Sequence, residues 1–295
     1  MGRLSEPDHL ERSHWLERER PWLIKLRLLG LHLACLLALI YPPDQQLLWI
    51  SSAVYLIQMF GMEVGYHRYF SHRSFKTSRL FQLTLALMAM STGQRGVISW
   101  AATHRVHHKR SDTQLDPHSP VARSTWYAYF AWIWDERNLN PSPTLARDLI
   151  KTPELLALNR HHALYVYALL LGLYLTGERT ALLGATGRGL ELLIWGGLIP
   201  TLLSLHATMW VNAFAHRAGA SAEDERADSS RNVWWIALVT LGAGWHRNHH
   251  RYPYLARAGL LWWQLDLSYL MLRLLQRLGL IWELRDQREV ELRAP

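Results

Sequence analysis

Residues 46–72, QLLWISSAVYLIQMFGMEVGYHRYFSH, join a long apolar stretch directly to two histidines. The part from about Gln46 to Tyr66 has the roughly 20 residues that a helix needs to cross a bilayer. His67 and His72 follow it without an intervening loop. The sequence therefore predicts that this histidine pair lies at the face of a membrane.

Three further stretches have the apolar composition of membrane spans. They cover about residues 21–41, 162–177 and 190–211, and the stretch 162–177 is the shortest. Pro42 and Pro43 force a turn between the first two spans. The mean hydropathy is only −0.07 although 49% of the residues are hydrophobic, so a large polar part stands outside the lipid.

The positions of Lys and Arg orient the predicted spans. Of the 32 such residues, 6 lie in residues 1–27, 13 in 67–160 and 11 in 212–295, whereas the loop 177–189 holds 2 and the turn 42–46 none. Segments rich in Lys and Arg next to spans stay on the cytoplasmic side. We therefore expect both termini and the segment 67–160 in the cytoplasm.

Eight histidines form three clusters. These are His67 with His72, His104-Arg-Val-His107-His108, and His246-Arg-Asn-His249-His250. In a helix, positions i+3 and i+4 lie within about 60° of i, and an adjacent pair is about 100° apart. The two rings of an adjacent pair can therefore reach different ions, which predicts a site for two neighbouring metals. Positions i and i+5 are about 140° apart, so His67 and His72 serve separate ions or lie where the helix unwinds.

Further candidate residues lie close to these clusters. His216 follows the last span and is a natural ninth ligand, and Asn212, one turn earlier, can hold a bound water. Asp112, Asp116 and His118 lie just beyond the second cluster, where they orient ligand rings or cap a loop. Glu63, one turn before His67, has the same two interpretations.

Several classes of protein are disfavoured. A structural zinc site needs about four ligands, not eight or nine, and a metal transporter would place ionisable ligands at mid-membrane depth. The net charge of +8 follows the membrane topology rather than an aromatic-rich stripe, so we expect no nucleic-acid partner. Imidazole binds Zn, Cu, Fe and Ni, and with Cys35 as the only cysteine, iron is the candidate that we favour.

These motifs resemble those of the membrane-bound fatty acyl desaturases, the stearoyl-CoA desaturase-like branch with delta-9 selectivity. The matching text is GYHRYFSHRSFKTS, ATHRVHHKRSDTQLDPHSP, WVNAFAH and NVWWIALVTLGAGWHRNHHRYP, and the resemblance runs from about Gln46 to Leu284. It implies a pair of iron ions that activates O2 and a cis double bond formed in a saturated acyl chain. The implied metal ligands are His67, His72, His104, His107, His108, His216, His246, His249 and His250, with Asn212 acting through water.

The resemblance also implies a substrate tunnel, bent at Trp100 and Thr208 and lined by Gln94. A bend fixes which pair of otherwise similar CH2 groups meets the metals. Ala102, Thr103 and Arg95 depart from the residues that the family carries beside a CoA group. The acyl carrier therefore stays open between CoA, a carrier protein and a phospholipid.

The sequence predicts one all-α integral membrane domain over residues 1–295, with four spans and a cytoplasmic helical cap that holds a dinuclear metal site. The cap comprises residues 67–161 and 212–295. We expect membrane lipid and a fatty acyl substrate as partners, and electrons from a separate ferredoxin or b-type cytochrome with its reductase. The alternatives are a membrane hydroxylase of acyl chains, or a non-catalytic metal-binding or metal-transporting membrane protein.

Overall fold

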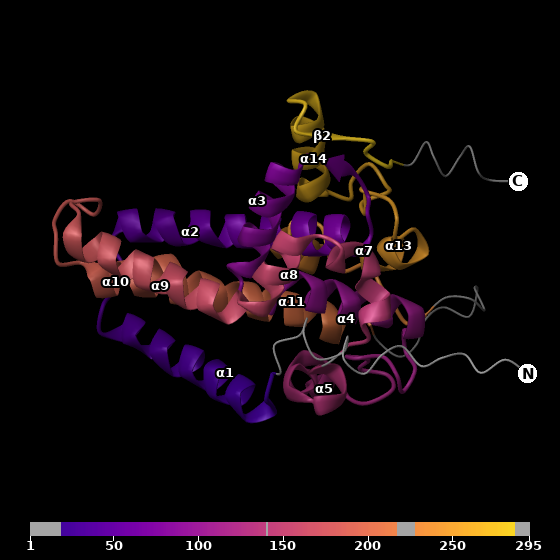
Figure 1. Ribbon diagram of the computed structural model, residues 1–295, viewed down its shortest axis with the longest axis horizontal. Coiled ribbons are helices and arrows are strands. Elements are labelled where there is room, and N and C mark those ends of the chain that lie inside the picture. The colour runs from indigo at the N-terminus through magenta and orange to yellow at the C-terminus, as the bar shows by residue number, and fades with distance from the viewer. Residues whose placement is uncertain (1–18, 140, 217–227, 287–295) are drawn as a thin grey trace, which may run out of the picture.

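The computed structural model describes residues 19–139, 141–216 and 228–286, and these residues are mostly helical. Long helices extend toward one end of the molecule, and short helices gather at the other end (Figure 1). The long elements are α1 (Pro21–Cys35) with η1 (Leu36–Leu39), α2 (Gln45–Phe60) with η2 (Gly61–Ser71), α9 (His162–Arg179), and α10 (Gly189–Leu193) with η5 (Ile194–Leu198) and α11 (Ile199–Phe214). The shorter elements are α3 (Arg79–Met90), α4 (Val97–Arg110), α5 (Thr125–Tyr129), η3 (Ala131–Trp134), α6 (Glu136–Leu139), η4 (Pro143–Ala146), α7 (Arg147–Ile150), α8 (Pro153–Arg160), α12 (Trp234–Val239), α13 (His246–Arg251) and α14 (Leu267–Arg277).

Three helices in the described part of the chain are long and apolar enough to cross a membrane. They are Pro21–Leu39, Gln45–Ser71 and Gly189–Phe214. In the first of these, only 11% of the residues in the most apolar window are buried, so most of its side chains are at least partly exposed. The second, with 27 residues, is about 40 Å long and exceeds the roughly 30 Å hydrocarbon core of a bilayer. Its last turns, which carry His67, therefore extend beyond the lipid when the helix spans it.

The stretch 162–177, which we expected to be a fourth span, forms helix α9 but does not join this set. His162, Glu178 and Arg179 lie within the bounds of α9 and lower its mean hydropathy. Gly177 and Gly189 allow α9 and α10 to approach closely, because a Cβ on Gly177 would lie 2.6 Å from the backbone oxygen of Arg188. Helix α9 thus runs beside α10, as Figure 1 shows.

The helix that carries the first histidine cluster widens rather than ends. Residues 61–71 form a π-helix, η2, with the backbone N–H of His72 donating to the oxygen of His67 at 3.2 Å. Bonds from i+5 to i place residue i+5 over residue i, so the 140° separation of an ideal α-helix does not apply. Gly61 packs η2 directly on α3, where a Cβ would lie 2.4 Å from the backbone of Met88. His67 and His72 are therefore brought to the same side.

The all-α expectation needs one small correction. Strands β1 (Lys76–Thr77) and β2 (Ile281–Trp282) form an antiparallel pair with Lys76 opposite Trp282 and Thr77 opposite Ile281. Two-residue strands carry no apolar periodicity that a sequence pattern can reveal. The pair joins the chain just after the first histidine cluster to the segment that follows α14.

Candidate metal centre and acyl cavity

Nine histidines converge in two groups at the end of the molecule where the short helices gather. Within each group, one ring nitrogen per residue lies within 4.8 Å of the others, so each group can hold a metal ion. The first histidine group comprises His67, His72, His104, His108 and His249. The second histidine group comprises His107, His216, His246 and His250. All nine residues are those singled out in the sequence.

Each ring directs its Nε2 atom toward the other rings of its group. In the first group, the Nε2 atoms of His72 and His104 are 2.8 Å apart, and those of His67 and His249 are 2.9 Å apart. The Nε2 atom of His108 lies 3.0 Å from that of His249. Bonds from a metal such as zinc to histidine nitrogens are about 2.0–2.1 Å long. Neighbouring nitrogens bound to one such ion lie about as far apart as these Nε2 atoms. The five nitrogens therefore fit a shared ion.

The second group has the same geometry. The Nε2 atoms of His216 and His246 are 2.9 Å apart, and those of His107 and His250 are 3.2 Å apart. Helices α4 and α13 each contribute to both groups, because the adjacent rings at the end of each cluster diverge. Helix α4 gives two histidines to the first group and one to the second, whereas α13 gives one and two. The two groups are thus held together by the same pair of helices.

Hydrogen bonds from neighbouring segments fix the two helices that carry the clusters. The Asn159 Oδ1 atom accepts from the backbone N–H groups of Ile98 and Ser99, which caps the first turn of α4. In α13, the Asn248 side chain donates to the oxygen of Ala258 and to Gln264 Oε1, both at 2.8 Å. A six-residue helix is too short to be stable alone. The contacts of Asn248 therefore position the third cluster.

Carboxylates lie behind four of the rings, at the Nδ1 atoms that face away from the groups. Glu63 Oε2 is 2.9 Å from His67, Asp116 Oδ1 is 3.0 Å from His107, and Asp228 Oδ2 is 2.5 Å from His250. Asp112 Oδ1 lies 3.5 Å from the Nδ1 atom of His216. A carboxylate at Nδ1 fixes the tautomer that leaves Nε2 unprotonated and strengthens the ring as a ligand.

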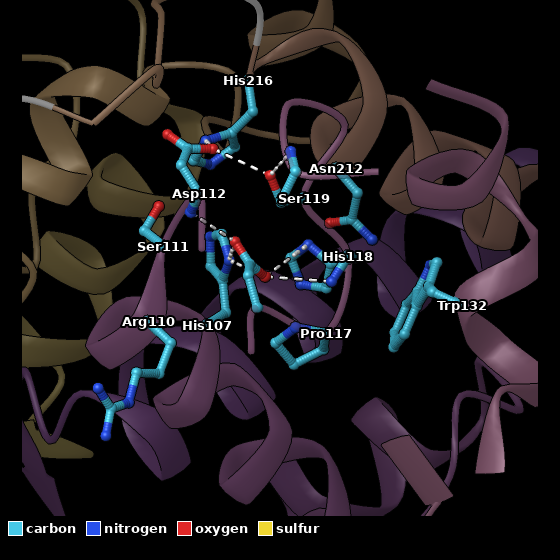
Figure 2. Close-up of polar contacts among 12 residues, drawn as sticks. His107, Arg110, Ser111, Asp112, Pro117, His118, Ser119, Trp132, Asn212 and His216 are labelled. Carbon is cyan, nitrogen blue, oxygen red and sulfur yellow. Dashed lines mark hydrogen bonds and ion pairs between the residues drawn. The ribbon is translucent and has the colours of Figure 1, made fainter. Parts of the chain in front are cut away.

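The segment after α4 folds back so that its acidic residues reach the rings. Figure 2 shows this for Asp112, which lies beside His216. Asp116 also accepts from the backbone N–H groups of Asp112 and His118 at 3.0 and 3.1 Å. It therefore caps its own loop while it contacts His107. The two interpretations of this segment, ring orientation and loop capping, describe the same carboxylate.

Asp228 was missed in the sequence. It lies in a polar segment without apolar periodicity, and only the fold brings it to His250. Ser111 donates to the Asp228 Oδ2 atom at 2.7 Å, and the backbone N–H of Ser230 donates to Oδ1 at 3.1 Å.

Glu63 could be recognised from its i−4 spacing to His67. It also accepts from the buried Arg68, whose Nη2 atom bonds Asp266 at 2.9 Å.

The histidines of the second and third clusters have a pKa below the usual value. Burial and then the neighbouring imidazoles lower the pKa of His104 and His249 well below the usual value. The same causes lower the pKa of His108 to about 3. A neutral imidazole with Nδ1 bonded to an acceptor leaves the Nε2 lone pair free. The donor set therefore suits a transition metal such as iron, zinc, copper or nickel.

A cavity of about 570 Å³ lies between α1, α9 and α11 and is also lined by residues of α4 and η3. The predicted tunnel residues Gln94, Trp100 and Thr208 all line it. Trp100 stacks between the rings of Tyr66 and His104, with centroids 5.1 and 5.0 Å away, and Gln94 donates to the Thr208 hydroxyl at 3.2 Å. A second cavity of about 50 Å³ shares Trp100 and Thr208 and also touches rings of both groups.

Asn212 and His118 line both cavities. Asn212 lies on α11 one turn before His216 (Figure 2), and its side chain is buried where the two cavities meet. The contact that it makes among the described residues is with the Met209 sulfur, at 4.0 Å. Its amide therefore faces a space large enough for a water molecule beside the histidines. His118 packs on His107, with ring centroids 4.3 Å apart.

Comparison with known proteins agrees with this geometry. The sequence model of the fatty acid desaturase family matches residues 46–278. An acyl-CoA 5-desaturase of Anemone leveillei is 35% identical over 90% of this chain and 79% of its own length. An sn-1 stearoyl-lipid 9-desaturase of Anabaena variabilis is 34% identical over 88% of this chain and 92% of its own. A hex-5-enoyl-[acyl-carrier protein] acetylenase of Moorena producens is 34% identical over 83% of this chain and 78% of its own.

Proposed function

The chain belongs to the fatty acid desaturase family, and from that premise we propose that it inserts a cis double bond, at the delta-9 position, into a saturated acyl chain. Family membership makes it an oxidoreductase that acts on fatty acyl chains. The observation that carries the proposal is the junction of two histidine groups with a long cavity. We propose the delta-9 position because the Anabaena variabilis relative is a 9-desaturase.

We infer that the nine histidines hold two iron ions, five on one and four on the other, with Asn212 adding a water to the site. The fit of the residues supports this, since the ring nitrogens of each group lie close together and the rings present Nε2 inward. When bound, such an iron pair supplies the activation of O2 that removal of hydrogen from an unactivated C–H bond requires. The rings of the second group are oriented by Asp112, Asp116, His118 and Asp228. In the first group, Glu63 orients the ring of His67.

The protein's own contribution to the reaction is positioning and exclusion of water. The apolar cavity holds the acyl chain. The acyl chain is bent where it passes Trp100, Thr208 and Gln94, so that one of its C–C bonds lies at the metals. Two hydrogens leave the chain, and O2 takes up these hydrogens with two electrons and two protons to give two water molecules. A separate ferredoxin, or a b-type cytochrome with its reductase, supplies the electrons.

We propose a four-span topology, with α9 as the third crossing and the cap, both termini and the metal centre in the cytoplasm. Helix α9 lies beside α10, and the basic residues concentrate in the segments next to the cap end. A helix with a polar end can still cross a membrane when neighbouring helices cover that end. Cysteine-accessibility labelling of residues in the 177–189 loop tests this topology.

Expression in a desaturase-deficient host, followed by mass spectrometry of the acyl chains, tests the reaction. Desaturation removes two hydrogens from the substrate, whereas hydroxylation adds one oxygen. We expect products lighter by two hydrogens with the double bond at one position. Products that gain oxygen would identify a hydroxylase. Unchanged host lipids, together with purified protein that contains no iron, would identify a non-catalytic metal-binding protein.

A further inference from the structure

The two ends of the large cavity differ in chemistry. Toward the middle of the predicted membrane the lining is apolar, with Leu31, Ala34, Leu170 and Leu198. At the cap end, charged and polar groups take over. This end, here called the polar end, is lined by Glu19, Arg27, Arg95, Trp132, Asn138 and His162. An acyl chain has the same polarity, since an apolar tail is followed by an oxygen-bearing head.

The charges of the polar end do not cancel. Glu19 Oε1 accepts from the Arg27 Nη1 atom at 3.0 Å and from the His162 Nε2 atom at 2.9 Å. Burial raises the pKa of Glu19, but these partners outweigh it and lower the pKa below its usual value, so Glu19 is ionised. Among the described residues that line this end, the one carboxylate of Glu19 interacts with two guanidinium groups, those of Arg27 and Arg95. The polar end therefore favours groups that carry partial or full negative charge.

Two N–H groups in this region have no hydrogen-bond partner within the part of the chain that the structure describes. Among the described residues, the buried side-chain nitrogens without one are Arg95 Nε and Trp132 Nε1, and both residues line the polar end. The remaining Arg95 nitrogens bond the backbone oxygens of Asn138 and Leu139. The Asn138 side chain in turn donates to the oxygen of Trp132 at 3.0 Å. The two donors therefore belong to one connected corner of the cavity.

A buried donor without an acceptor is costly, because it has lost its hydrogen bonds to water. The methylene groups of an acyl tail cannot provide the acceptor, whereas an oxygen at the head of the chain can. On the basis of the proposed function, we propose that Arg95 and Trp132 bind the carbonyl oxygen of the acyl substrate at the polar end of the cavity. This anchor fixes the distance along the chain from the carbonyl carbon to the histidine groups. It thereby determines where the double bond forms.

Direct binding tests the anchor with probes that differ only in the oxygens. Purified wild-type protein is titrated calorimetrically with methyl palmitate and with hexadecane, which has no acceptor. We expect methyl palmitate to bind about tenfold or more tightly, as one neutral hydrogen bond from Trp132 and one charge-assisted hydrogen bond from Arg95 predict. Palmitic acid, palmitoyl-CoA and dipalmitoyl phosphatidylcholine are then compared, because their carbonyl groups represent an acid, a thioester and a lipid ester. The tightest of the three identifies the source of the acyl group.

Trp132→Phe removes the N–H group and keeps an aromatic ring. We expect it to reduce the preference for methyl palmitate by about threefold to tenfold, to raise KM more than it lowers kcat, and to spread the double bond over several positions. Trp134→Phe is the matched control, since Trp134 lies on the same short helix η3 but does not line the cavity. Arg95→Lys keeps the charge, lacks Nε, and should act in the same direction as Trp132→Phe.

The outcomes separate the anchor from the proposed function. Equal affinity of the wild type for methyl palmitate and hexadecane would overturn the anchor, as would a Trp132→Phe variant that behaves like Trp134→Phe. A wild type that prefers methyl palmitate but forms no unsaturated product would retain the anchor and overturn the desaturase reaction. Desaturation by the wild type with unchanged double-bond position in both Trp132→Phe and Arg95→Lys would retain the reaction and overturn the anchor.

Discussion

His107 and His108 are neighbours on α4, yet their rings reach different histidine groups. The Nε2 atom of His108 lies 3.0 Å from that of His249, whereas the Nε2 atom of His107 lies 3.2 Å from that of His250. The helical turn of about 100° between adjacent residues causes this divergence. One helix therefore serves both groups, and changes at these two positions should affect different ions.

We predict that His107→Ala and His108→Ala each abolish desaturation and each remove one of the two proposed ions. The loss follows because each variant deletes an Nε2 atom from a different group. Metal analysis of purified protein, with activity measured in parallel, checks the prediction, and His249→Ala should resemble His108→Ala. His161→Ala, an exposed histidine at the end of α8, is the control and should keep both. Near-normal turnover in either variant would show that the ligand assignment is wrong.

Asp228→Asn should weaken metal binding without unfolding the protein. The carboxylate holds the Nδ1 atom of His250 at 2.5 Å, and an amide of the same size holds it less strongly. Loss of such a partner costs about 10–100-fold in metal affinity or activity. Competition with a chelator measures the affinity. Glu283→Gln, which loses an exposed ion pair with Lys76, should leave the affinity unchanged.

Arg68→Met should strongly destabilise the fold. The Arg68 guanidinium is 2% exposed and bonds both Glu63 and Asp266, so its removal leaves two buried carboxylates without their cation. Breaking a buried charge network in this way costs about 3–5 kcal/mol. Thermal unfolding in detergent measures the effect. Arg79→Met, which breaks the exposed pair with Glu154, should lower the melting temperature far less, because water screens an exposed ion pair. Equal melting temperatures of the two variants would contradict the prediction.

The nine histidines that the structure brings together are those that the sequence singles out, but the sequence left open how they divide between the two groups. The 3.6-residue period was enough to separate His107 from His108, because α4 is a regular helix there. For His67 and His72 the same period left two alternatives, separate ions or a helix that unwinds. The structure places both rings in the first group on a π-helix, which depends on packing against α3 at Gly61 and has no pattern of its own. Asp228 could not be predicted because its contact with His250 is made only by the folded chain.

Lowering the pH should remove a contribution from Asp148 to stability. Burial raises the pKa of Asp148, but hydrogen bonds from Arg105 and Arg73 outweigh it and lower the pKa to about 2. A carboxyl group with a lowered pKa in the folded state stabilises above the unfolded-state value of about 3.9 and loses that contribution as the pH falls toward 2. The carboxylate is 41% exposed, so water screens the pair and the contribution stays below about 1 kcal/mol.

Comparison of wild type with Asp148→Asn over pH measures this contribution. The wild type should melt at a higher temperature at pH 6, and the difference should shrink between about pH 4 and pH 2. Asp148 accepts hydrogen bonds from Arg105. Arg105 also donates to the backbone oxygens of Ser71 and Phe70 next to the first histidine cluster. A difference that stays constant down to pH 2 would show that the charge of Asp148 does not stabilise the fold.

Thr208→Val should change where the double bond forms more than how fast it forms. Valine keeps the branched shape of threonine but cannot accept the hydrogen bond from Gln94 at 3.2 Å, so Gln94 is released from its contact across the cavity. The bend of the chain is then held by Trp100 alone, which stacks between Tyr66 and His104. The substitution also removes the bond that the Thr208 hydroxyl donates to the backbone oxygen of Ser204 at 2.9 Å. We expect a mixture of double-bond positions with turnover reduced about tenfold or less, because two neutral hydrogen bonds are lost. Mass spectrometry of derivatised products resolves the positions. Thr84→Val, on the exposed side of α3, is the control, and a single unshifted product from Thr208→Val would separate this contact from selectivity.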